Sequence, residues 1–219
     1  KQECMNTLII IITLLVILGI GFIDLFLEVK NYSDKHSFAM DFLEKYTNYI
    51  KSKGESDEDY VWLTLRAERM QNQLGSSGVM NYKMAGSLKF ISNYPIILNF
   101  LPEIRNEFSD GYINKSNFEF TINTVRDTLL RHIGFIEDTK KDYDKQIVNS
   151  LAWFRNGVLL IVLFPIKILN QFGLLSNLSY SKVKSSKIFK ILASLISIIG
   201  FVSSIMSIIL GWNEFIKIF

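Results

Sequence analysis

The sequence is poor in the residues that most site chemistry and cross-linking need. Its 219 residues include one cysteine, Cys4, two histidines, His36 and His132, and three prolines. A single cysteine excludes a disulfide framework within the chain. The histidines are far apart, and neither has a metal-type partner at helical spacing, so we expect structural or surface roles for both. The sequence therefore predicts no metal site and no cofactor.

Catalytic motifs are also missing. The chain has no nucleophile elbow, HExxH pair, Walker lysine or glycine fingerprint. The GSSG turn at 75–78 lacks the lysine and the preceding strand that a phosphate-binding loop requires. Carboxylates between 138 and 144 alternate with lysines, which is typical of a solvated helix face. We predict no catalytic residue and no enzymatic activity.

The positive charge is not spread evenly along the chain. Residues 28–150 hold 16 Lys and Arg against 18 Asp and Glu, whereas the remainder holds 8 against 3. Nucleic-acid binding would need a basic patch on the central region, and that region is slightly acidic. We therefore expect no nucleic-acid partner and assign the basic residues to lipid contact and membrane topology.

Apolar residues make up 49% of the chain, and the excess lies in three blocks, 7–27, 157–175 and 191–212. The first block predicts an N-terminal transmembrane anchor within residues 1–29. Asp24 is a polar residue inside it, one turn before Glu28, where we expect the helix to leave the lipid. The last block has no charged residue over about 22 positions, enough at ~1.5 Å per residue to cross a ~30 Å hydrocarbon core.

The middle block leaves two alternatives open. Lys167 follows Pro165 after a short uncharged stretch, so a spanning helix would have to bury or snorkel this lysine, whereas a re-entrant or interfacial helix would not. Positive-inside topology favours the re-entrant form with the central domain in the cytosol. The residues expected at the membrane interface are Trp153, Arg155, Lys182, Lys184, Lys187 and Lys190.

Small residues recur every three or four positions along the last block and so share one helical face. Such faces let helices approach closely in lipid. The face predicts packing against another helix, within the chain or between subunits of a homo-oligomer, with Gly200 as the critical contact. The serines of the same face would also suit the wall of a pore. The face comprises Ala193, Ser197, Gly200, Ser204, Ser207 and Gly211.

The central region has the apolar periodicity of several helices. We expect an irregular stretch at 79–94 and a short helix after Pro95 that Pro102 interrupts. A rod-like helix over 116–151 is expected to organise the domain. The other expected boundaries are caps at Ser33 or Asp34 and at Asp57, and helix ends at Gly54 and Gly75.

These patterns predict an all-α membrane protein with an anchor at 1–29, a helical soluble domain at 30–150 and a C-terminal membrane region at 151–219. We expect a non-enzymatic, membrane-anchored sensor or scaffold whose helical domain binds a protein partner. The alternative is an oligomeric pore-forming or membrane-disrupting effector of the phage-defence or toxin–immunity type. The heavy use of Ile, Asn, Lys and Ser indicates an AT-rich bacterial genome, so we expect the inner membrane as the location.

Overall fold

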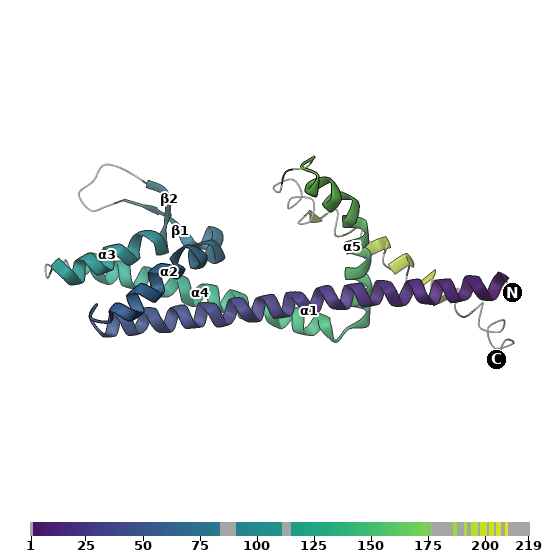
Figure 1. The fold of residues 1–219 in the computed structure, drawn as a ribbon, viewed down its shortest axis with the longest axis horizontal. Coiled ribbons are helices and arrows are strands. Elements are labelled where there is room, and N and C mark those ends of the chain that lie inside the picture. The colour runs from purple at the N-terminus through teal and green to yellow at the C-terminus, as the bar shows by residue number, and fades with distance from the viewer. Residues whose placement is uncertain are drawn as a thin grey trace. The chain divides into compact units, whose positions relative to one another are not determined.

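The computed structural model describes residues 2–83, 91–110 and 115–174, and isolated stretches at 176, 186–187, 191, 194–196, 198–200, 202–203, 205–206 and 209. The prediction of a predominantly helical chain is confirmed (Figure 1). The elements are α1 (Gln2–Lys51), α2 (Asp57–Leu74), the 3₁₀ turn η1 (Gly75–Gly78), β1 (Val79–Tyr82), β2 (Ile91–Pro95), α3 (Ile96–Asp110), α4 (Lys115–Ile147) and α5 (Ser150–Gln171).

The chain divides into two compact units. Asn31–Lys140 forms one unit, which we call the helical unit. Lys1–Lys30 and Lys141–Phe219 form the other, which we call the anchor unit. Both α1 and α4 contribute residues to each unit.

The helical unit has one hydrophobic core, to which its four α-helices all contribute. Each helix supplies a stripe at spacings of three or four residues, as an amphipathic helix does when it buries one face. Tyr46 also joins α1 to α4, because its hydroxyl donates to the Ile122 carbonyl oxygen at 3.0 Å. The fully buried members include Phe42 and Tyr49 of α1, Leu63 and Met70 of α2, Ile97, Phe100 and Ile104 of α3, and Val125, Leu129 and Ile136 of α4.

Three helix boundaries differ from the sequence prediction. Ser33 and Asp34 do not start a helix, because α1 continues through them without a break. The N-cap of α2 is Ser56, whose hydroxyl accepts from the Asp59 amide, so that Asp57 is the first helical residue instead of the cap. The rod predicted over 116–151 ends at Ile147, and Asn149 caps a new helix, α5.

Pro102 does not interrupt α3, contrary to expectation. It lies with Leu98, four residues earlier, on the exposed side of the helix. A proline removes the hydrogen bond to the carbonyl of residue i−4, and water can replace that bond on an exposed face. The helix therefore tolerates the proline there.

The predicted ends of the first two helices of the helical unit are confirmed. Gly75 caps α2 with a positive φ of 55°. Gly54 has a φ of 84°, and its amide donates to the Tyr49 carbonyl oxygen at 3.1 Å in the bonding pattern of a Schellman motif. A Cβ at Gly54 would also lie 2.9 Å from the Phe108 side chain, so both conformation and packing require glycine there.

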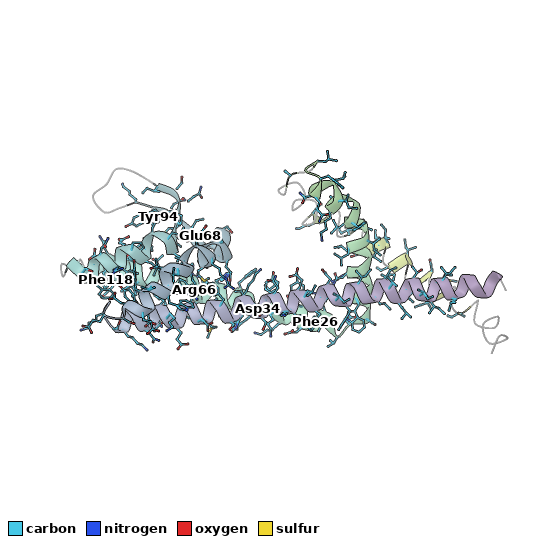
Figure 2. The ribbon with its side chains drawn as sticks, viewed as in Figure 1. Phe26, Asp34, Arg66, Glu68, Tyr94 and Phe118 are labelled. Atoms are coloured by element: carbon cyan, nitrogen blue, oxygen red, sulfur yellow. The ribbon has the colours of Figure 1, made fainter. Side chains whose placement is uncertain are left out.

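A β-hairpin replaces part of the stretch predicted to be irregular. β1 and β2 pair antiparallel, with Met80 opposite Tyr94 (Figure 2 labels Tyr94). Tyr82 and Tyr94 stack with ring centroids 4.9 Å apart, and both rings contact Phe100 of α3. Cross-strand aromatic pairs stabilise such pairing, and the contact with α3 covers one face of a hairpin too small to be stable alone.

A buried glutamine fixes the hairpin to the helices. The Gln71 amide nitrogen donates to the Gly78 carbonyl oxygen at 2.8 Å, and its side-chain oxygen accepts from the Ile97 amide at 2.9 Å. Gln71 is only 8% exposed. One side chain of α2 therefore satisfies backbone groups at the start of β1 and at the start of α3.

Replacing this glutamine should destabilise the helical unit. Gln71→Leu leaves two buried backbone groups without partners, at a cost of about 2–4 kcal/mol in the free energy of unfolding. The measurement is amide hydrogen exchange of the full chain in detergent micelles, in which the Ile97 amide should lose protection. Asn72→Leu, at the next and exposed position, is the matched control. Equal protection in the two variants would contradict this role for Gln71.

Candidate functional site

The first half of α1 is the best membrane-spanning candidate. It is the one helix in the described part of the chain that is long and apolar enough to cross a membrane by itself, and only 11% of its most apolar window is buried. A core helix of a soluble protein would be mostly buried. Large apolar side chains such as Leu15, Ile23 and Phe26 are instead more than half exposed (Figure 2 labels Phe26). Lipid is the environment that suits such a surface.

Membrane insertion of the C-terminal region is less clearly shown. α4 and α5 meet the same criterion only as a bent pair, so the structure does not show α5 as a span of its own. α5 is one helix that includes Pro165 and Lys167; it ends at Gln171, Phe172 is its C-cap, and Gly173 follows with a φ of 72°. Of the 22 residues of the third apolar block, 10 lie outside the described residues.

Within the anchor unit, α1 and α5 cross at two glycines. A Cβ built on Gly21 would overlap the Trp153 carbonyl oxygen, and one built on Gly157 would overlap the Ile17 carbonyl oxygen. Real Cβ atoms do not approach backbone that closely. The two helices therefore contact backbone to backbone at a spot where only glycine fits on either side, as in small-residue packing between membrane helices.

Aromatic and polar contacts flank this crossing. Phe22 and Trp153 meet edge to face with centroids 5.0 Å apart, and the Trp153 indole nitrogen donates to the Ile147 carbonyl oxygen at 2.8 Å. The Arg155 guanidinium donates to the Gln146 side-chain oxygen at 2.7 Å. The start of α5 is thus attached both to α1 and to the end of α4.

The remaining residues predicted as sites are placed as follows. Asp24 is partly buried in α1, and Lys167 and Lys187 are exposed. A Cβ on Gly200 would meet the Phe154 ring of α5 at 3.7 Å, an ordinary van der Waals distance within the chain. The other predicted residues, Lys182, Lys184, Lys190, Ala193, Ser197, Ser204, Ser207 and Gly211, lie outside the described residues.

Bulky side chains at the two glycines should separate α1 from α5. With Cys4→Ser as background, Phe22→Cys and Trp153→Cys provide a pair for a short bifunctional thiol reagent in membranes. We expect efficient cross-linking that Gly21→Val or Gly157→Val reduces several-fold, because overpacking at such a contact costs about 1–3 kcal/mol. Gly19→Val is the matched control, since a Cβ there meets nothing within 4 Å. Equal yields in all variants would contradict the crossing.

The helical unit contains a pocket between η1 and α4. It measures about 320 Å³ and is lined by Ser77, Thr128, Arg131, His132 and Phe135. Thr128 and His132 are buried, whereas the Phe135 ring is 62% exposed. In the described part of the chain, His132 Nε2 is buried without a hydrogen-bond partner.

We expected structural or surface roles for both histidines, and the two lie in different environments. The His36 Nε2 lies 3.2 Å from a Glu137 carboxylate oxygen in a half-exposed pair. His132 is buried on α4 beside the apolar stripe, and burial, aided by the charge of Lys35, lowers the pKa of its imidazole. Sequence reasoning missed this pocket. The one available indication was that Thr128 and His132 stand one turn apart next to the stripe of Val125, Leu129 and Ile133.

The helical unit should lose stability on acidification because of His132. Its pKa in the folded state lies below the ordinary 6.5, so the unfolded chain binds the proton more readily. The contribution of neutral His132 to the free energy of unfolding is complete above about pH 6.5, and it is lost as the pH falls through the folded-state pKa. Hydrogen exchange of α4 amides between pH 7.5 and 5 should show this loss, after correction for intrinsic rates, and His132→Gln should diminish it. An unchanged pH dependence in His132→Gln would disprove the assignment.

Metal ligands are not gathered anywhere in the described residues: no group of three or more His, Cys, Asp and Glu side chains could hold an ion there. No protein-family model matches the chain, and searches of curated proteins and of solved structures also return no match. The function must therefore be argued from the chain's own geometry.

Proposed function

We propose that the protein is a non-enzymatic, membrane-anchored sensor or scaffold whose helical unit binds another protein. The observation that carries this proposal is the dual composition of α1. Its first half has the length and apolar surface of a membrane span, and its later residues Phe38, Phe42 and Tyr46 belong to the core of the helical unit. A unit whose own core helix begins as a membrane span would be held at the bilayer surface.

An exposed apolar pair on α2 supports a protein partner. Val61 is 54% and Leu65 is 76% exposed, and they lie one turn apart on the same helical face. Charged residues such as Arg66 and Glu68 flank them (both labelled in Figure 2). An apolar centre inside a polar rim is the usual composition of a protein interface. Arg66 is also partly fixed, since its guanidinium lies 4.3 Å from the centroid of the Trp62 ring.

The charge distribution around the apolar blocks supports a location in a bacterial inner membrane, with the helical unit in the cytosol. α5 would then be a re-entrant or spanning helix held to α1 at Gly21 and Gly157. Homo-oligomerisation would use the small-residue face of the third block. The oligomeric pore remains the alternative function, and no observation in the described residues favours it.

The partner surface can be tested by photo-cross-linking in membranes of the native host. A photoreactive amino acid at Leu65 of the full chain should give a discrete adduct with one protein, whereas the same group at Asn48, an exposed polar position of α1, should not. Leu65→Glu should then weaken binding of the identified partner about tenfold or more, as expected for a central apolar contact. Thr64→Glu, at the adjacent exposed position, should have little effect.

The pore alternative predicts a different result. Purified protein would then release a trapped dye from lipid vesicles, and its expression would depolarise cells. Release of dye without any Leu65 adduct would overturn the scaffold proposal.

A further inference from the structure

The pocket between η1 and α4 brings several hydrogen-bonding side chains to one place. Within the described residues, His132 Nε2 is buried without a hydrogen-bond partner, and the Ser77 and Thr128 hydroxyls belong to residues that line the same pocket. Thr128 is 6% and His132 is 8% exposed. Nearly all buried polar groups of folded proteins are paired, so an unpaired imidazole nitrogen beside a pocket calls for a water, an ion or a ligand.

The charge around this pocket is positive. The Arg131 guanidinium lines it, and its Nε donates to the Asp127 carbonyl oxygen at 3.2 Å, which holds the base of the side chain on α4. The charge of Lys35 on α1 reaches His132 as well. No carboxylate is among the described residues that line the pocket. A guanidinium with neighbouring hydroxyl donors suits an anion that presents several oxygens.

We propose that this pocket binds the phosphoryl group of a small soluble molecule. Arg131 would supply the charge and a fork of donors, Ser77 and Thr128 would donate their hydroxyls, and the exposed Phe135 ring would form one wall for the rest of the ligand. The volume of about 320 Å³ fits a small phosphorylated molecule and is too small for a folded partner. This inference deepens the sensor role proposed above by naming a ligand class, and it rests on a pocket separate from Val61 and Leu65.

The test uses the imidazoles as reporters. The chain has two histidines, so isotope-labelled histidine in the full protein gives two sets of imidazole signals, which His36→Gln assigns. The protein is held in nanodiscs of neutral lipid, and inorganic phosphate is titrated against chloride at constant ionic strength. We expect the His132 signals to shift saturably, whereas the His36 signals, from a side chain that contacts Glu137 outside the pocket, stay nearly constant.

Variants separate binding from screening by salt. Arg131→Gln should weaken phosphate binding about tenfold or more, the effect of losing a hydrogen bond to a charged group. Arg126→Gln, which removes an exposed arginine of the same helix outside the pocket, should leave binding unchanged. Thr128→Val removes one hydroxyl with little change in shape and should weaken binding even if Arg131→Gln fails to fold.

Three results would overturn the proposal. One is a linear shift of both histidines with phosphate, which would indicate screening alone. Another is equal phosphate affinity in Arg131→Gln, Thr128→Val and the unmodified protein. The third is acetate binding as tight as phosphate binding, which would make the pocket a carboxylate site. None of these results depends on the Leu65 adduct, so the phosphoryl-binding proposal and the protein-partner proposal can be disproved independently.

Discussion

The structure depends on a constraint placed on α1, which must suit two different environments along one helix. From Leu8 to Leu27 its large side chains are apolar apart from Asp24 and mostly exposed, and water would make that surface unfavourable by about 25 cal/mol per Å². From Phe38 onward the apolar residues are buried on one face and the other face is polar. A bilayer around the first part and a packed core around the second satisfy both requirements without a break in the backbone.

The same constraint explains how α5 is attached. In lipid the hydrophobic effect does not drive helices together, so close packing and polar contacts must do so. Gly21 and Gly157 allow backbone contact, and dispersion gains from such contact are largest where no side chain intervenes. Trp153 adds an edge-to-face contact with Phe22 and a hydrogen bond to the end of α4. These contacts fix where α5 begins.

Much of the fold could be predicted from periodicity, because α2, α3 and α4 each bury one clear stripe. The hairpin could not, since its pairing depends on Gln71 and Phe100, which are distant in sequence and meet β1 and β2 only after α2 and α3 pack. The crossing glycines were missed for a similar reason. Gly19 and Gly21 look alike in the sequence, and which of them faces a partner is decided by the rotation of α1 against α5.

The pocket between η1 and α4 shows why buried polar residues can be hidden in an amphipathic pattern. Thr128 and His132 lie beside the apolar stripe of α4, where an apolar residue would pack without cost, and an unpaired buried polar group costs about 1–3 kcal/mol. Even one such group, His132 Nε2, is a noticeable share of a typical total stability of about 5–15 kcal/mol. A ligand that bonds to the folded pocket alone would recover part of that energy and stabilise the packing of α4 by mass action.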